Sequence, residues 1–172
     1  MSLQTAVRTR RTHKAFDAEP VDTETLRELF ELARWAPNHH LTNPWRFRVL
    51  GAQARARLAE EAELDKSGSA SKLKRAPTLI VASAKLQGDG SQQRDDLLAA
   101  AVAAYIVLLG AHARGLAGYW RTVPLLNSPS VRAALTIAPD EQLVGLLHLG
   151  SPLQDQRVPE RAPVDEIATF LD

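Results

Sequence analysis

An apolar run of fifteen residues, LLAAAVAAYIVLLGA, constrains the fold of this chain more than any other feature, and it extends from Leu97 to Ala111. The run is shorter than the roughly 20 apolar residues that a membrane-spanning helix needs. We therefore expect a helix that is buried in a core or at an interface. Asp95 and Asp96 stand just before the run, where acidic side chains favour the positive end of a helix, so the helix is expected to extend from them to about Arg114.

The composition is compatible with one domain over residues 1–172, since 45% of the 172 residues are apolar. The formal net charge of +1 is too balanced for a general nucleic-acid binder. The chain has no cysteine, which excludes disulfides, thiolate metal sites and thiol redox chemistry. No secretory signal pattern opens the sequence, so we expect a cytoplasmic protein without a nucleic-acid or membrane partner.

Helical periodicity and capping residues predict four further helices. These helices cover about residues 2–10, 22–36, 52–65 and 128–137. Asp22 or Thr23 is expected to cap the second of them and Ser128 the fourth. Pro37 is expected to end the second helix, because the residue before a proline avoids the α region.

Alternating and apolar stretches predict four strands. These strands cover about residues 44–51, 76–86, 115–124 and 142–152. Residues 65–74, which are rich in Gly, Ser and Lys, are expected to form a surface loop, and the proline-rich residues 154–163 an extended tail. Because helices and strands intermix without a regular βαβ alternation, the predicted class is α+β.

Several common kinds of active site are excluded by missing motifs. There is no Gly-x-Gly-x-x-Gly after a strand, no Walker loop and no Gly-x-Ser-x-Gly elbow. His39 and His40 are adjacent rather than four residues apart, and no cysteine or nearby glutamate completes a zinc site with them. We therefore expect no metal site, no Rossmann site and no acyl-transfer chemistry.

The stretch RTRRTHKAFD, residues 8–17, holds five cationic side chains in ten positions. Arg10 can grip a phosphate with two parallel hydrogen bonds and Thr12 through its hydroxyl group, where the predicted first helix ends. Lys14 lies two residues further along and can meet a second anionic part of the same ligand. The stretch is equally compatible with a solvated basic helix end, which also favours cations.

A second unusual cation, Arg121, stands between Trp120 and Thr122 near the end of a predicted strand. It is either another phosphate or ribityl contact or a surface arginine on an edge strand. Trp35 and His39 flank Pro37, and together with a phosphate site they can frame an aromatic cofactor.

The motifs RRTHKAFD, APNHHLTNPWRFRVL, GLAGYWRT and LVGLLHLGSP together resemble the flavin-dependent nitroreductase family, particularly its compact members. The resemblance extends from about residue 3 to residue 170. It implies an α+β fold with a central, mainly antiparallel sheet that is flanked by helices. It also implies an intertwined homodimer with FMN at the dimer interface, where both subunits touch each FMN.

The resemblance assigns cofactor roles residue by residue. Residues in the first segment match those that hold the FMN phosphate and ribityl chain or approach the flavin pyrimidine: Arg10, Arg11, Thr12 and Lys14. Trp120, Arg121 and Thr122 match the second FMN segment. Trp35 and His39 match residues that contact flavin from the partner subunit. A stretch linked with the nicotinamide nucleotide matches Gly110, Ala111, His112, Ala113, Arg114 and Gly115.

The chain departs from the family pattern at three places. Leu41 and Asn43 stand where many members carry Asn and Gln, which hydrogen-bond the flavin. A late Lys/Arg pair of larger members has no clear counterpart, although Arg157 or Arg161 can replace it. The long mid-chain insertion that covers the flavin in larger relatives is absent.

The function that the resemblance implies is an FMN-dependent NAD(P)H oxidoreductase of the nitroreductase type. Hydride passes from nicotinamide to flavin N5 and then to a nitroaromatic, quinone or similar acceptor by a ping-pong cycle. No catalytic side chain is required, because the flavin carries the chemistry. Three alternatives stay open: a flavin-binding or flavin-carrying module without turnover, a related flavin-consuming or dehalogenating enzyme, and a basic helix end that binds nucleic acid.

Overall fold

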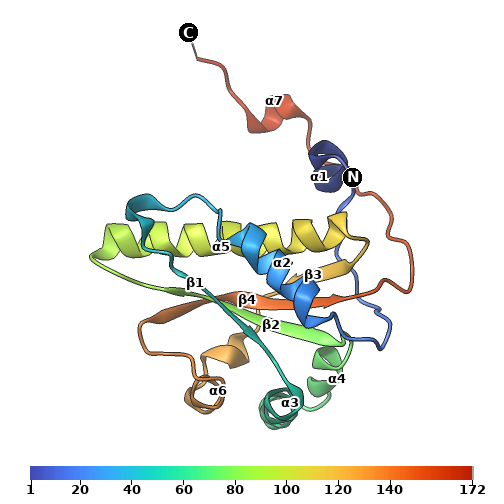
Figure 1. Ribbon diagram of the computed structural model, residues 1–172, viewed down its shortest axis with the longest axis vertical. Helices are drawn as coiled ribbons and strands as arrows, with labels where there is room; N and C mark the ends of the chain where they lie inside the picture. The colour runs from blue at the N-terminus through green and yellow to red at the C-terminus, as the bar shows by residue number, and fades with distance from the viewer. Residues whose placement is uncertain (172) are drawn as a thin grey trace.

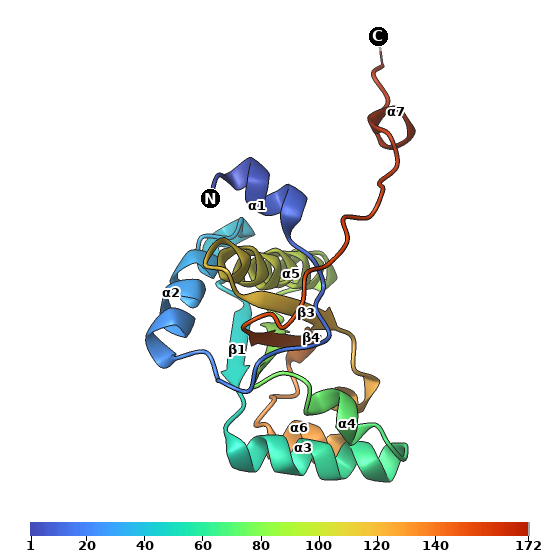
Figure 2. The same cartoon turned by 90° about the vertical axis from the view of Figure 1, so that its right-hand side faces the viewer.

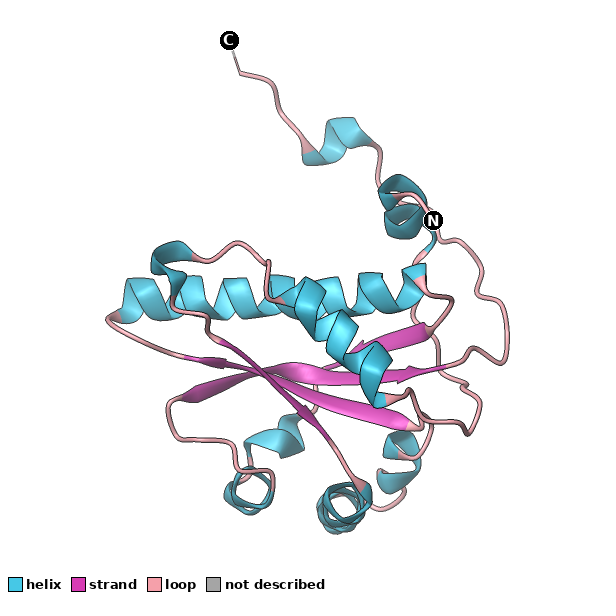
Figure 3. Ribbon diagram, in the orientation of Figure 1, coloured by secondary structure: helices cyan, strands magenta, loops and turns pink. Residues whose placement is uncertain are grey.

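A four-stranded antiparallel sheet forms the centre of the protein (Figures 1 and 3). The computed structural model describes residues 1–171, except for the side chain of Lys72. The strands are β1 (Trp45–Val49), β2 (Thr78–Lys85), β3 (Ala117–Arg121) and β4 (Glu141–Gly150). Their order is β1-β2-β4-β3, so β1 and β3 form the two edges. Each strand overlaps a predicted one, and the α+β class is confirmed.

The helices α2 (Thr23–Ala33) and α5 (Gly90–Ala113) cover one face of the sheet (Figure 1). Small and branched side chains make this layer dense: Ala103, Ala104 and Val107 of α5 are completely buried. They pack in one cluster with leucines of α2 and with residues of β2 and β4. Figure 1 shows α5 along the sheet and α2 crossing it in front.

The other face carries α3 (Ala52–Asp65), α4 (Ala70–Leu73), η2 (Pro124–Asn127) and α6 (Pro129–Ala134), as Figures 2 and 3 show. A second apolar cluster fills the space between these helices and the sheet; it includes Leu58 of α3, Val131 of α6 and Leu79 of β2. Ser128 caps α6 by accepting from the N–H of Val131, so the predicted cap is confirmed.

The two ends of the chain lie on the same side of the molecule. α1 (Leu3–Thr9) packs against α5, and residues 153–171, which include α7 (Val164–Ile167), leave the body as an arm (Figure 2). The arm exposes large apolar side chains: Leu153, Val158, Val164, Ile167, Phe170 and Leu171. Such an exposed apolar segment is typical of an interaction surface.

The start of α5 differs from the prediction. The helix begins at Gly90, because Asp89 accepts hydrogen bonds from two N–H groups of the first turn. The predicted start at Asp95 and Asp96 is wrong, since Asp96 is completely buried inside the helix and bonds other segments. A capping carboxylate and a buried carboxylate cannot be distinguished by composition alone.

Two other boundaries also differ. α2 ends at Ala33, before Pro37, and the turn that follows closes through Arg34 and Trp35. The predicted loop over residues 65–74 contains the single-turn helix α4. Burial of the Leu73 side chain in the core beneath α3 accounts for this helix, because it holds the segment against the rest of the protein.

By length and composition alone, α5 also qualifies as a membrane-spanning helix, with 24 residues and an 18-residue window of mean hydropathy 1.8. Half of that window is buried inside the protein. The buried side packs against the sheet and α2. The prediction of a buried core helix from the apolar run is therefore confirmed.

Candidate functional site

Residues 10–14 run along the β3 edge of the sheet. Thr12 forms an isolated parallel bridge with Gly118, and the N–H of His13 donates to the Gly118 carbonyl at 3.1 Å. The family resemblance assigns residues 10–14 and residues 120–122 to one ligand. The first segment lies beside β3, and the second forms the end of β3 and the residue that follows it. We call residues 10–14, β3, Thr122 and the neighbouring His148 of β4 the β3-edge site.

The end of α1 brings two arginines to this site, and the fold uses them differently. The guanidinium of Arg11 turns back and donates to the carbonyls of Arg8 and Arg10, each at 2.6 Å. The guanidinium of Arg10 lies 5.9 Å from the centre of the Tyr105 ring of α5. Arg11 therefore holds the end of α1, where carbonyl groups need donors, while Arg10 lies half-buried over an aromatic ring.

Five buried side-chain nitrogens lack a hydrogen-bond partner among the described residues, and all five belong to the β3-edge site. They are Arg11 Nε, His13 Nδ1, Arg121 Nη1 and both ring nitrogens of His148. His148 pairs with Tyr119 across the β3–β4 ladder, and the two ring centres are 5.6 Å apart. Because an unpaired buried donor costs free energy, this concentration indicates a place for a polar ligand.

The charge of the site is carried by arginines rather than histidines. Burial, followed by the charge of Arg10, lowers the pKa of His13. Burial, again the largest cause, and the charge of Arg121 lower the pKa of His148 to about 4. Both imidazoles are therefore neutral near pH 7, each with one donor and one acceptor nitrogen.

Of the other predicted cofactor-binding side chains in these segments, one packs within the fold and two are exposed. Trp120 packs into the core on the α5 side, and its indole N–H donates to the Val144 carbonyl at 3.1 Å. The indole N–H is thus used within the fold. Lys14 and Thr122 have exposed side chains and are accessible to a ligand.

Trp35 and His39 lie away from the β3-edge site. Trp35 is 76% exposed and lines a hollow of about 230 Å³ with Trp45 of β1, the opposite edge strand. The His39 ring lies beside that of His40, with ring centres 3.8 Å apart and the planes tilted by 43°. His39 also lines a hollow at the first turns of α5. Arg10 lies near the other end of this helix, which is about 36 Å long for its 24 residues. One chain therefore does not bring Trp35 and His39 to the same ligand as Arg10.

Leu41 and Asn43, the two departures from the family pattern, belong to the loop of residues 38–43. Both take a left-handed backbone conformation, with φ of 50° and 48°. The Asn43 side-chain amide donates to the Leu41 carbonyl at 2.7 Å, and the Leu41 side chain is 78% exposed. Asn43 therefore stabilises the loop itself.

Residues 110–115, the predicted nicotinamide segment, end α5 and turn into β3. A Cβ on Gly110 would come within 3.0 Å of a leucine of α2, so the glycine permits close helix packing. His112 Nε2 lies 2.8 Å from Thr9 Oγ1, and Arg114 forms a salt bridge with Glu28 at 2.9 Å. These roles within the chain account for three of the six residues, and the nicotinamide contact stays a prediction.

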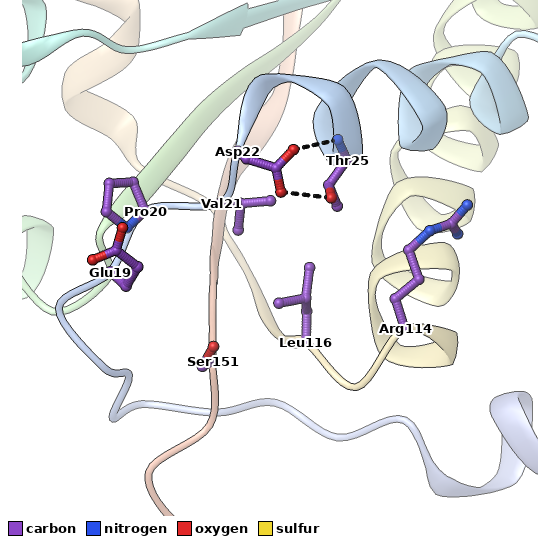
Figure 4. A pocket seen from close by; sticks show the side chains of 8 residues that line it. All are labelled: Glu19, Pro20, Val21, Asp22, Thr25, Arg114, Leu116 and Ser151. Atoms are coloured by element: carbon purple, nitrogen blue, oxygen red, sulfur yellow. Dashed lines mark hydrogen bonds between the residues drawn. The ribbon is translucent and has the colours of Figure 1, made fainter.

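A hollow of about 380 Å³ lies beside Arg114, between the start of α2 and the turn into β3 (Figure 4). The Asp22 carboxylate accepts from the N–H and the hydroxyl of Thr25 at 2.8 and 2.7 Å, which caps α2. Arg114 is already paired with Glu28. We assign no ligand to this hollow.

The arm begins beside the β3-edge site. The Gln154 main chain and the Asp155 charge both raise the pKa of His13, against the larger effects of burial and Arg10. Arg157 and Arg161 follow with exposed side chains. Which of the two contacts a phosphate stays open.

Among residues 1–171, no group of three or more His, Cys, Asp or Glu side chains is arranged to hold a metal ion. Sequence analysis missed His148, although a lone polar residue in the apolar strand LVGLLHLG was a usable signal. The β3–β4 register shows that it pairs with Tyr119, and the charge of Arg121 acts on it.

The sheet order and the helices on its two faces define a nitroreductase-like α+β fold. The model of the nitroreductase family matches residues 7–151. The chain belongs to the nitroreductase family.

Individual relatives agree with this result. YdjA of Escherichia coli (strain K12), named as a candidate NAD(P)H nitroreductase, is 30% identical over 149 residues, which cover 78% of this chain and 80% of the relative. The crystal structure of a nitroreductase-like family protein from Bacillus cereus superposes with a TM-score of 0.90 at 23% identity, over 100% of this chain and 97% of that one. A candidate nitroreductase from Desulfovibrio desulfuricans, solved in complex with FMN, has a TM-score of 0.81 at 23% identity and covers 100% and 98%.

Proposed function

We propose that this chain is an FMN-dependent NAD(P)H oxidoreductase of the nitroreductase type, with the FMN phosphate at the β3-edge site. The observation that carries the proposal is that the five buried side-chain nitrogens without a partner among the described residues belong to the segments of this site. The name of the Escherichia coli relative and the FMN complex of the Desulfovibrio protein support the choice of nucleotide and cofactor.

The donors of the site suit a phosphate group. Arg121 Nη1 and Arg11 Nε are buried N–H groups without an acceptor, and phosphate oxygens supply strong acceptors. Arg10 adds a further guanidinium, and the exposed hydroxyls of Thr12 and Thr122 can donate to the phosphate or the ribityl chain. Neutral His13 can donate or accept beside them without adding to the charge.

FMN held at this site would supply the redox chemistry, hydride transfer from NAD(P)H to a nitroaromatic, quinone or similar acceptor in a ping-pong cycle. The residues of the chain would bind the cofactor and orient it. The exposed Lys14 would approach the pyrimidine part of the ring, where a fixed cation stabilises negative charge. Consistent with this division, the site needs no nucleophile and no general base.

The complete site requires two copies of the chain. Trp35 lies beside β1, the opposite edge of the sheet, and His39 lies at the first turns of α5, so both would contact the cofactor only from a partner subunit. The apolar side chains Leu98 and Val102 of α5 are 56% and 42% exposed. In Figure 1, α1 and the arm lie on the same side of the sheet as α5. A homodimer that covers this face and brings the two halves of each site together accounts for both observations.

An absorbance spectrum of the purified protein, recorded before and after NADH or NADPH is added without oxygen, tests the proposal. Flavin bands that bleach on addition are the expected result. A protein that is colourless and takes up no added FMN would refute it. Flavin bands that neither nucleotide bleaches would instead favour a flavin-carrying module without turnover.

A further inference from the structure

The loop of residues 38–43 is held in an unfavourable backbone conformation. His40, Leu41 and Asn43 have φ of 55°, 50° and 48°, and they are three of the four non-glycine residues with positive φ in the described chain. Residues with a Cβ rarely adopt this region, so the surroundings must impose it. Backbone strain of this kind is concentrated at functional sites.

A buried carboxylate imposes the conformation. Asp96 of α5 is completely buried, and its Oδ1 accepts from the Thr42 hydroxyl at 2.5 Å and from Gln92 Nε2 at 3.0 Å. Its Oδ2 accepts from the Gln87 N–H at 2.9 Å. The three donors come from the loop, the turn between β2 and α5, and α5 itself. A buried carboxylate needs such donors, so it ties the three segments together.

Thr42 is held at both of its polar groups. Its hydroxyl donates to Asp96 and accepts from Asn38 Nδ2 at 3.0 Å, and its carbonyl accepts from Gln87 Nε2 at 2.9 Å. Asn38 Oδ1 accepts from the Asn43 N–H at 2.6 Å, which closes the loop. The Thr42 side chain therefore bonds the buried Asp96, and Asn38 bonds Thr42 and Asn43 within the loop.

The outward side of the same loop exposes one large apolar side chain, Leu41, near Trp35. Leu41 is 78% exposed and Trp35 is 76% exposed, and both line the hollow of about 230 Å³ beside β1. Asn38 and Asn43 line the same hollow. The network that is anchored on Asp96 thus determines the shape of the surface that Trp35 and His39 present.

We propose that Asp96 is a positioning residue that acts through Thr42: it holds the loop of residues 38–43 in the shape with which one subunit completes the FMN site of its partner. This inference rests on the proposed function. Asp96 itself is buried and touches no ligand, so its effect on cofactor binding is indirect and is exerted on the other subunit's site.

Thr42→Val tests the link, because it removes the hydroxyl and keeps the shape of the side chain. Loss of a hydrogen bond to a charged group is expected to raise the Kd of FMN by about tenfold. Thr42→Ser is expected to restore binding, since it returns the hydroxyl. Thr23→Val, at an exposed threonine of α2, is the matched control and is expected to leave the Kd unchanged. A Kd for Thr42→Val equal to that of the control would overturn the inference.

A mixed dimer separates action on the partner from damage to the subunit itself. Subunits with Thr42→Val and subunits with Arg10→Ala carry different affinity tags and are co-expressed, and the doubly tagged dimer is titrated with FMN. One site then combines an intact phosphate segment with an intact loop, and the other contains both defects. We expect about half of the sites to bind FMN with the wild-type Kd. If no site regains that Kd, the loop does not act across the interface and the inference is wrong.

Wild-type protein, titrated first, separates this inference from the proposed function. If the wild type binds no FMN, the proposed function itself fails. If the wild type binds FMN as a dimer and the mixed dimer shows no restored site, only the inference fails. Should Thr42→Val not fold, Gln92→Met removes a different donor to Asp96, and an unchanged Kd in this variant would count against the inference; a smaller increase in Kd is expected.

Discussion

Arg10 and Arg11 are neighbours with the same side chain, yet the fold gives them different tasks. The Arg11 guanidinium donates hydrogen bonds to two main-chain carbonyls at the end of α1. Arg10 has its guanidinium over the Tyr105 ring. Replacement of Arg11 therefore affects α1 as well as any ligand, whereas replacement of Arg10 reports mainly on the ligand.

Arg10→Ala is expected to weaken FMN binding by about 1.5–3 kcal/mol, the range for a hydrogen bond to a charged group. Isothermal titration of the apoprotein with FMN measures the change in Kd. Arg8→Ala, which removes an exposed cation two residues earlier, in the last turn of α1, is the control and should bind FMN as the wild type does. An unchanged Kd in Arg10→Ala would refute the assignment of the FMN phosphate to this site.

At the scale of single residues, the sequence identified candidate ligand-binding side chains. It did not show which of them are buried or already hydrogen-bonded. A cluster of cations at a helix end is visible in RTRRTHKAFD. That the Arg121 Nη1 atom and the two His148 nitrogens are buried without partners depends on strand register and on the layers above the sheet. Burial and pairing are properties of the folded environment, so no local pattern encodes them.

Three strands of the sheet are joined by one ion pair. Arg48 of β1 donates to both carboxylate oxygens of Glu141 at the start of β4, at 2.8 and 2.6 Å, and Ser83 of β2 donates to the same carboxylate at 2.5 Å. Burial alone raises the pKa of Glu141, but the hydrogen bonds from Arg48 and Ser83 and the charge of Arg48 outweigh it and lower the pKa to about 2.

The sign of the pH effect follows from this lowered pKa. Since the ordinary pKa of the unfolded glutamate is higher, the carboxylate stabilises the fold above about pH 4.5 and loses its contribution as the pH falls towards about 2. Between about pH 5 and about pH 3, wild-type protein should lose about 2 kcal/mol more unfolding free energy than Glu141→Gln. Urea unfolding at the two pH values measures the difference. Glu160→Gln, in the exposed arm, should behave as the wild type; equal losses in Glu141→Gln and wild type would exclude this role of Glu141.

The helices and strands were predictable where local signals agree. Ser2, Asp22 and Ser128 cap their helices through side-chain hydrogen bonds, and all three lie where the sequence places a helix start. The start of α5 was missed because Asp89, Asp95 and Asp96 are equally good caps by residue type. Only tertiary packing makes Asp96 a buried anchor for the loop of residues 38–43.

At the scale of the whole molecule, almost every side chain of the arm, residues 153–171, is exposed. Phe170 and Leu171 are each 89% exposed, and Ile167 is 75% exposed. In the proposed dimer, these side chains pack on the partner subunit, which makes the arm part of the interface.

Deletion of residues 157–172 is expected to weaken the dimer and, with it, FMN binding, because each site needs both subunits. Light scattering after gel filtration measures the mass, and a titration measures the Kd of FMN. The deletion keeps the bridge between Phe16 and Pro152, so the body of the fold retains its contacts. A truncated chain that remains a dimer and binds FMN with the wild-type Kd would show that the arm is dispensable for both.

Local sequence patterns predicted most of the helices and the four strands, because helix caps and strand alternation act over a few residues. The resemblance of motifs spread over the chain indicated the nitroreductase family and, with it, FMN as the ligand. Tertiary contacts place residues 10–14 against β3, Trp35 beside β1 and His39 at the first turns of α5, and they tie the loop of residues 38–43 to α5 through Asp96. These are contacts between residues distant in the chain, and they form only when packing of the apolar layers brings the segments together.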